Sequence, residues 1–187
     1  KAGYTMYYIG VDLGGTNIAI GIVNEDFEIV KKGSVPTKPE RGADPIIADM
    51  AALSRKLMEE MGIGMDDISF IGVATPGTAN NQTGVVEYAN NIPFLQYPLA
   101  ANLSALMDGK PVYIENDANA AAKAEAVGCH HCVLGSDEGI GLCQEQVAHA
   151  GLADFLHKFA EHIVPPAVIG AENQHHRRGG NEGLVVT

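Results

Sequence analysis

The 187-residue sequence predicts an α/β fold in which a mixed β-sheet packs against helices. Two observations lead to this prediction. Three runs of strand-forming residues follow one another within the first 32 residues, which is typical of antiparallel strands joined by short turns. Helical and strand-like segments then alternate as far as about residue 127, which indicates further strands of the same sheet connected through helices.

The first three strands are expected at 6–13, 18–23 and 27–32, with a turn at 24–26. Each run is rich in Ile, Val and Tyr, and each is bounded by Gly, Asn or Asp, as strand ends usually are. Because the connections are short, we expect the three strands to form an antiparallel meander.

The first helix is expected to begin with Asp44 as its N-cap and Pro45 as its first helical residue. It is expected to end at Gly62 and Gly64. Between these limits, apolar residues recur at spacings of 4, 3 and 4, which is the period of one buried helix face. These residues are Ile46, Met50, Leu53 and Leu57.

Later apolar runs predict two more helices and three short strands. One helix is expected at 98–107, and a second helix, which is rich in alanine, is expected at about 116–127. After residue 128 the sequence has no clear period until a helix expected at 151–163. The strands are expected at 69–74, 85–89 and 111–115.

Composition excludes several classes of protein. The net charge of −11 and the pI of about 4.9 argue against nucleic acid as a partner, because phosphate contacts need clustered Lys and Arg. No run of about 18 apolar residues predicts a membrane span. The N-terminus has no apolar signal segment, so we expect a cytoplasmic protein whose natural start is Met6, with residues 1–5 added ahead of it.

The segment "DLGGTN", from Asp12 to Asn17, stands between the first two strands. A glycine pair permits positive φ and a tight hairpin, and successive backbone N–H groups can form an anion-binding nest. Thr16 adds a hydroxyl, and Asp12 could hold Mg²⁺ through water. The segment therefore predicts a phosphate-binding hairpin, although a plain β-turn would also explain it. The P-loop and dinucleotide-binding patterns do not occur.

Three later segments place polar residues next to strand ends. "GVATPG" puts Gly77 directly after a buried strand, where a loop could close over a ligand. "YANNIPF" presents Asn90 and Asn91, which alone would be an ordinary turn. "IENDANAAA" places polar side chains between a strand end and a helix start, a common position for ligand groups, although Asp117 could simply cap the helix. These side chains are Glu115, Asn116, Asp117 and Asn119.

In this order, the motifs "IGVDLGGTNIAIGIV", "GVATPG", "NNIP" and "ENDANAAA" resemble the ROK family of bacterial sugar kinases. The resemblance covers about residues 6–127, and within the family it is strongest to glucokinases. It implies the N-terminal lobe of an actin/hexokinase-like (ribonuclease H-like) ATPase fold. It also implies a glycolytic transferase that phosphorylates a hexose, in particular glucose to glucose 6-phosphate, with ATP and Mg²⁺ as cofactors. A homodimer is expected when a second lobe is complete.

The resemblance also implies residue roles. Asp117 matches the general base that takes the proton from the sugar hydroxyl. Such a base suits phosphoryl transfer, which depends mainly on positioning and charge neutralisation. Gly77, Asn91 and Asn116 match residues at the sugar. The residues expected at phosphate and Mg²⁺ are Asp12, Gly14, Gly15, Thr16 and Asn17.

The resemblance weakens after residue 128, so 128–187 is expected to be a partial or divergent second lobe. "VLGSDEGIGL" is at best a degraded form of the family's second phosphate loop. "HAGLADFLH" resembles a sugar-contact segment that would add Asp154 and His157, although an amphipathic helix explains its apolar residues equally well. A zinc site is a further possibility, but the spacing differs from the family's and reduced thiols are the alternative. Its ligands would be Cys129, His130, His131, Cys132 and Cys143.

Two other functions remain open from the sequence. One is a regulator of the same family that binds sugar without turnover, and the other is a catalytically inactive fragment of one lobe. Two complete lobes would need roughly 300 residues. The intact "DLGGTN" and "ENDAN" segments favour the enzyme.

Overall fold

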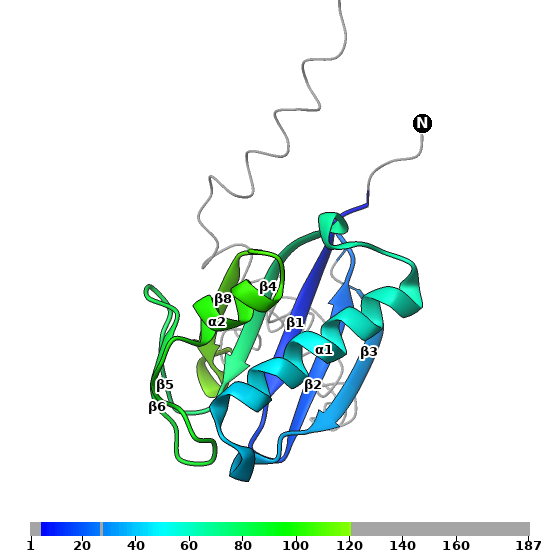
Figure 1. The fold of residues 1–187 in the computed structure, drawn as a ribbon. Coiled ribbons are helices and arrows are strands. Elements are labelled where there is room, and N and C mark those ends of the chain that lie inside the picture. The colour runs from blue at the N-terminus through cyan, green and yellow to red at the C-terminus, as the bar shows by residue number, and fades with distance from the viewer. Residues whose placement is uncertain (1–4, 27, 121–187) are drawn as a thin grey trace, which may run out of the picture.

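The computed structural model describes residues 5–26 and 28–120, which form a five-stranded sheet with two helices and a small second sheet (Figure 1). The five-stranded sheet has the order β3-β2-β1-β4-β8. Its strands are β1 (Tyr7–Leu13), β2 (Asn17–Val23), β3 (Ile29–Pro36), β4 (Ile68–Thr75) and β8 (Val112–Asn116). The small sheet consists of β5 (Thr78–Asn80), β6 (Val85–Tyr88) and β7 (Leu95–Tyr97).

The large sheet is mixed, as predicted. β1, β2 and β3 pair antiparallel, whereas β1, β4 and β8 pair parallel. Asp12 pairs with Ala74, and Ala74 pairs with Glu115, so the last residues of the three parallel strands lie in adjoining rows. The carboxyl ends of these strands therefore meet at one edge, which we call the carboxyl edge.

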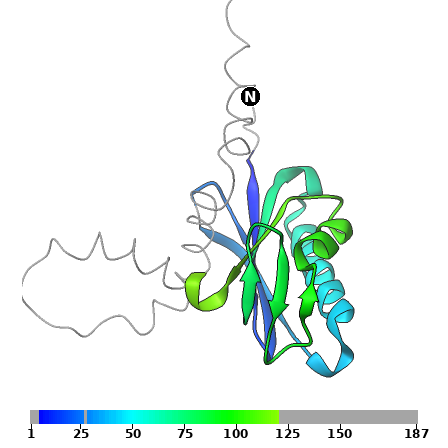
Figure 2. The same ribbon diagram turned by 90° about the vertical axis from the view of Figure 1, so that its left-hand side faces the viewer.

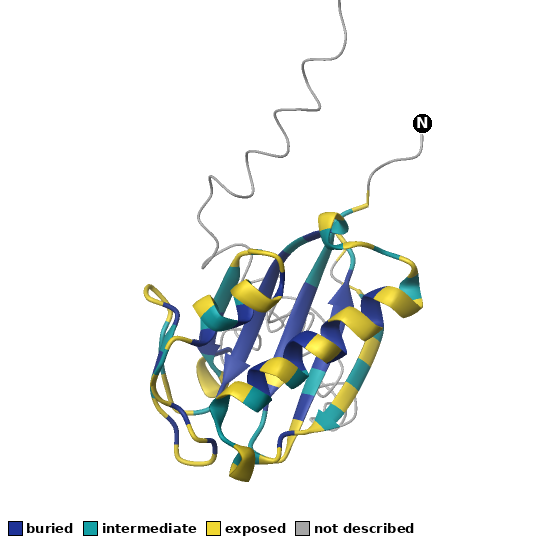
Figure 3. Ribbon diagram, in the orientation of Figure 1, coloured by how far each residue is buried: buried dark blue, intermediate teal, exposed yellow. Residues whose placement is uncertain are grey.

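Both helices, α1 (Ala43–Met61) and α2 (Leu99–Leu106), lie on the same face of the large sheet (Figure 2). The predicted apolar face of α1 is buried against the sheet, while its opposite face is exposed (Figure 3). Gly33 of β3 lets α1 approach closely, because a Cβ there would lie 3.1 Å from the Leu57 side chain. The period-4-3-4 pattern thus identified the packing face correctly.

The ends of α1 differ from the prediction. The N-cap is Gly42, with φ of 93°, and Asp44 and Pro45 are the second and third helical residues. The Asp44 carboxylate instead accepts a hydrogen bond from the Tyr97 hydroxyl, at 2.7 Å. At the other end Gly62 caps the helix at a φ of 70°, as predicted, but Gly64 precedes the separate short helix η2 (Met65–Asp67).

Within the described residues, the remaining predicted elements are present in the structure, but their bounds differ from the predicted ones. β3 begins two residues later than predicted and extends to Pro36, because it pairs with β2 as far as Asn17. The short helix η1 (Pro39–Arg41) and the three-residue strands β5 and β7 were not predicted, since so few residues show no periodicity. Among the described residues, no helix is both long and apolar enough to span a membrane.

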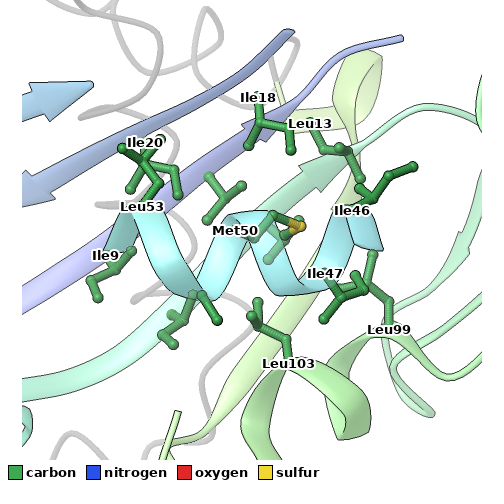
Figure 4. Packing of buried hydrophobic residues seen from close by; sticks show 14 of the residues in the cluster. Ile9, Leu13, Ile18, Ile20, Ile46, Ile47, Met50, Leu53, Leu99 and Leu103 are labelled. Atoms are coloured by element: carbon green, nitrogen blue, oxygen red, sulfur yellow. The ribbon is translucent and has the colours of Figure 1, made fainter. Parts of the chain in front are cut away.

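The core lies between α1, α2 and the sheet. Met50 is fully buried at the middle of α1, among side chains from β1, β2 and α2 (Figure 4). Its neighbours belong to the same cluster of buried apolar residues as the last residues of β1, next to the carboxyl edge. The labelled side chains around it are Ile9, Leu13, Ile18, Ile20, Ile46, Ile47, Leu53, Leu99 and Leu103.

We expect Met50→Ala to lower the free energy of unfolding by about 2–5 kcal/mol, because it leaves a cavity among well-packed neighbours. The exposed Glu59→Ala on the same helix should change it by no more than about 0.5 kcal/mol. Urea denaturation of the three proteins measures both values. Equal effects of the two substitutions would contradict the packing described for α1.

Candidate functional site

Four polar segments meet at the carboxyl edge, each at the end of a different strand. They are the β1–β2 hairpin, the turn after β4, the loop between β6 and β7, and the segment that follows β8. Direct contacts join them in series. A Cβ on Gly15 would lie 3.0 Å from the Asn91 Cβ, a Cβ on Gly77 would lie 2.9 Å from the Ala89 Cβ, and Asn116 bonds to Gly77. The sequence-predicted residues at 12–17, 77, 91 and 116–117 therefore share one site.

The β1–β2 hairpin is closed by a hydrogen bond from the Gly14 N–H to the Asn17 carbonyl, at 2.9 Å. Neither Gly14 nor Gly15 has a positive φ, so the hairpin does not use the positive φ that a glycine pair permits. The glycines are needed for close approach. A Cβ on Gly14 would lie 3.0 Å from the Asn17 carbonyl oxygen, and one on Gly15 would press against Asn91.

Thr37 fixes the shape of this hairpin, and no sequence pattern indicated this role. Its side chain is fully buried, and its hydroxyl donates to the Gly14 carbonyl at 2.7 Å. Its N–H donates to the Thr16 carbonyl at 2.9 Å. In the part of the chain that the structure describes, no hydrogen bond uses the N–H groups of Gly15 and Thr16. Thr37 therefore binds the carbonyls of the hairpin, whereas the N–H groups of Gly15 and Thr16 are left for a ligand.

Asp12 and Asp117 place two negative charges at the carboxyl edge. Although the residue as a whole is exposed, partial loss of hydration raises the pKa of the Asp12 carboxyl. The negative charge of Asp117 raises the pKa of Asp12 further. The Asp117 side chain is exposed and accepts one hydrogen bond, from the Ala118 N–H at 2.8 Å. A cation at this edge would relieve the repulsion between the two carboxylates.

Gly77 is the one site position where glycine is required by conformation. Its φ is +89°, and an added Cβ would lie 2.1 Å from the Tyr88 carbonyl oxygen. The turn after β4 is thus packed directly against β6. The Gly77 carbonyl accepts a hydrogen bond from the Asn116 side-chain amide at 2.7 Å, which joins this turn to the end of β8.

The helix cap after β8 is Asn116 and not Asp117. The Asn116 Oδ1 accepts a hydrogen bond from the Asn119 N–H at 3.0 Å, as an N-cap side chain does, and residues 117–120 are helical. The structure therefore does not support the simpler interpretation of Asp117 as the cap of this helix. Asn116 has two structural bonds, and one N–H of its amide remains for a ligand.

The loop that carries Asn91 is anchored at both ends. The Ala89 N–H donates to the Phe94 carbonyl at 3.1 Å, and Phe94 is buried. The ring of Phe94 stacks on Tyr97 with 4.8 Å between centroids, and Tyr97 reaches α1 through Asp44. Asn91 itself is exposed, and its side chain lies next to Gly15 of the hairpin.

Several predicted residues lie outside the described part of the chain, together with the remainder of the alanine-rich helix and the helix expected at 151–163. Among the described residues, no group of three or more His, Cys, Asp or Glu side chains is arranged to hold a metal ion. The predicted residues outside it are Cys129, His130, His131, Cys132, Cys143, Asp154 and His157.

Comparison with known proteins gives a consistent result. The sequence model described as "ROK family" matches residues 8–153, which extends beyond residue 127. The chain is 37% identical over 113 residues to a glucokinase from Thermotoga maritima, covering 60% of this chain and 34% of that protein. It is 30% identical over 154 residues to an N-acetyl-D-glucosamine kinase from Haemophilus influenzae, covering 78% of this chain and 48% of that protein.

Among solved structures, a ROK family glucokinase from Streptomyces griseus in complex with glucose and AMPPNP matches with a TM-score of 0.56 and 34% identity. The match covers 64% of this chain and 36% of that one. These likenesses confirm the predicted fold, an α/β lobe of the actin/hexokinase-like class with a mixed sheet. The chain spans about a third of the length of the glucokinases it matches.

Thr37→Val removes a buried hydroxyl at nearly constant volume. We expect it to lower the free energy of unfolding by about 1–3 kcal/mol, because the Gly14 carbonyl loses its partner. Ser54→Ala is the matched control, since the Ser54 hydroxyl donates to a carbonyl that α1 already satisfies, and its effect should be close to zero. Chemical denaturation measures both. A Thr37→Val protein as stable as the control would contradict the role given to Thr37.

Asp12→Asn is expected to stabilise the protein at neutral pH. A raised pKa in the folded state means that the ionised carboxylate opposes folding, so its removal is favourable above that pKa. The gain should vanish as the pH falls below about 4, where an aspartate is neutral when folded and when unfolded. Thermal unfolding at pH 7 and pH 3 measures the difference between the two proteins.

Glu60→Gln provides a control of opposite sign. The hydrogen bond and charge of Lys31 lower the pKa of Glu60, so its ionised form favours folding above its ordinary pKa. The effect should be small, because the pair is exposed. If Asp12→Asn destabilised the protein at pH 7, the electrostatic account of the carboxyl edge would be wrong.

Proposed function

The chain belongs to the ROK family, and on that premise we propose that it forms the sugar- and phosphate-binding lobe of an ATP-dependent hexose kinase. The observation that carries the proposal is the composition of the carboxyl edge. Within the described residues, the hairpin has two N–H donors that make no hydrogen bond, and the Asp117 carboxylate bonds only to the adjacent Ala118 N–H. Both lie at the same edge as Asp12, the last but one residue of β1. This is the set of groups that phosphoryl transfer to a hydroxyl needs.

Each group is proposed to have a separate role. Asp117 accepts the proton of the attacking sugar hydroxyl, because it is exposed and, among the described residues, bonds only to the neighbouring backbone. Asn91 and Asn116 hydrogen-bond sugar hydroxyls from two sides, next to the Gly77 turn. This placement leaves the sugar between the Gly77 turn and the hairpin.

The residues also fit ATP and Mg²⁺. The N–H groups of Gly15 and Thr16, with the side chains of Thr16 and Asn17, would receive phosphate oxygens, and Gly14 closes the turn behind them. Asp12 would hold Mg²⁺ through water, which suits an edge where, within the described ranges, no three His, Cys, Asp or Glu side chains are grouped to bind a metal directly. When bound, Mg²⁺ neutralises charge on the transferring phosphoryl group.

The proposed substrate is glucose, phosphorylated to glucose 6-phosphate. The support is the likeness to two proteins named glucokinase, one of which was solved with glucose and AMPPNP. The likeness to an N-acetyl-D-glucosamine kinase makes an N-acetylated hexosamine the second candidate. Asp154 and His157 as further sugar contacts, zinc at the cysteines and a homodimer remain parts of the proposal that concern residues outside the described ranges.

A coupled assay of ADP release tests the proposal on the natural protein that contains this sequence. ATP consumption should depend on glucose, and N-acetylglucosamine should support it less well. Binding of sugar without turnover would instead favour the sugar-binding regulator. If neither sugar supported ATP consumption, the proposal would be contradicted.

Asp117→Asn is expected to lower turnover at saturating sugar by about 10²–10⁴-fold, the range typical of a general base. The stability should stay close to that of the wild type, because Asn116 caps the helix. Steady-state kinetics with circular dichroism melting measures both effects. Asp66→Asn, an exposed substitution at the opposite end of the parallel strands, is the control.

Two outcomes of the Asp117→Asn measurement would contradict the role of Asp117 as the base. If Asp117→Asn retained more than about a tenth of wild-type turnover, Asp117 would not be the base, because a base contributes at least about 10²-fold. If turnover and global unfolding changed together, the role of Asp117 would be structural.

A further inference from the structure

Glu115 is the one carboxylate among the described residues that is almost completely buried, with 4% of its surface exposed. It is the last but one residue of β8, two positions before Asp117. Burial of a carboxylate is unfavourable unless donors surround it. Its surroundings therefore show what this side chain holds in place.

Three amide donors from three segments point to the Glu115 carboxylate. The Oε1 atom accepts from the Asn116 backbone N–H at 3.0 Å and from the Asn119 side chain at 3.4 Å. The Oε2 atom accepts from the Asn81 side chain at 3.5 Å. These donors belong to the end of β8, the helix that follows it, and the turn between β5 and β6.

From this arrangement we infer that Glu115 is a positioning residue for Asp117, a role that rests on the proposed kinase function. The backbone of Asn116 and the side chain of Asn119 flank Asp117 in the chain, and Glu115 Oε1 binds both. The peptide that carries Asp117 is therefore fixed on both sides by a single oxygen atom. The bond to Asn81 fixes the same group against the hairpin that follows the Gly77 turn.

Three substitutions of Glu115 distinguish the effect of the length of its side chain from the effect of its charge. Glu115→Gln keeps the length of the side chain, and its carbonyl oxygen can take both Oε1 bonds while the exposed Asn81 amide rotates to accept from the new NH₂. Glu115→Asp keeps the charge but withdraws the carboxylate by about 1.5 Å, one carbon–carbon bond. Glu115→Ala removes both.

We expect kcat to fall by about 10²-fold in Glu115→Asp and Glu115→Ala, since a displacement of about 1 Å can have that effect. Glu115→Gln should stay within about threefold of wild type, because the geometry of the Oε1 bonds is kept. The KM for ATP should stay within about threefold in all three variants, because the β1–β2 hairpin makes none of these bonds. These constants are measured on the natural protein that contains this sequence.

Glu87 gives the matched controls. It lies on β6 of the small sheet and accepts a hydrogen bond at 3.3 Å from the side chain of Asn80, the residue before Asn81. Glu87→Gln and Glu87→Asp should leave kcat unchanged, whatever they do to the melting temperature. A loss of kcat in the Glu87 variants equal to that in the Glu115 variants would mean that general stability, and not position, is measured.

A second measurement keeps the inference testable if the protein phosphorylates no sugar. Hydrogen exchange of the Asn116 backbone amide, followed by NMR on the 187-residue chain, reports the bond to Oε1 directly. Exchange should quicken at least about fivefold in Glu115→Asp and Glu115→Ala, and little in Glu115→Gln.

The two proposals can then fail separately. Absence of turnover in the wild type, with the expected exchange pattern, would overturn the kinase function alone and leave Glu115 as the residue that fixes Asp117. Wild-type exchange and turnover in Glu115→Asp would overturn the positioning role. So would a Glu115→Gln protein as impaired as Glu115→Ala, because the charge and not the reach would then matter.

Discussion

The parallel pairing of β1, β4 and β8 is the constraint on which the rest of this structure depends. It brings Asp12, Ala74 and Glu115 into one row, although they are far apart in the sequence. Each strand is followed by a turn with a different chemical character, and all these turns emerge at the same edge. The buried faces of α1 and α2 stabilise this pairing from one side of the sheet. The site is therefore a consequence of strand order, and each strand contributes one group to it.

The polar groups at the carboxyl edge divide into those that hold the structure and those that are left for a ligand. The side chains of Thr37, Asn116 and Glu115 form hydrogen bonds with neighbouring turns. As far as the structure describes the chain, Asp117 bonds only to the adjacent Ala118 N–H, and the N–H groups of Gly15 and Thr16 make no hydrogen bond. Such a division is expected of a binding site, because ligand groups must be positioned by others that are themselves fixed. Loss of hydration, and then the charge of Asp117, raise the pKa of Asp12 at this edge.

The sequence predicted the long elements and the approximate site, but not the contacts that shape them. The apolar period of α1 and the strand runs of β1 and β2 depend on local pattern, so they could be recognised before the fold was known. The N-cap of α1 was predicted two residues too late. Asp44 is a residue type that often caps helices, but here its carboxylate accepts a tertiary hydrogen bond from Tyr97 instead.

The same limit applies within the site. The glycine pair was correctly expected in a hairpin, but its purpose is close packing against Asn91 and not positive φ. Thr37 lies 23 residues from Gly14, and no local pattern could connect them. Glu115 stood out as one polar residue of a motif, yet only its burial and its donors indicate what it does.

We propose that the carboxyl edge is a formed site in this chain and that it binds sugar and nucleotide at separate places. Titration of the ¹⁵N-labelled chain, first with glucose and then with Mg²⁺ and AMPPNP, tests it most directly by NMR. Glucose should shift the amide signals of Gly77, Asn91 and Asn116, and the nucleotide should then shift those of Gly15 and Thr16. Shifts confined to the opposite end of the parallel strands, or none at this edge at millimolar ligand, would contradict the claim.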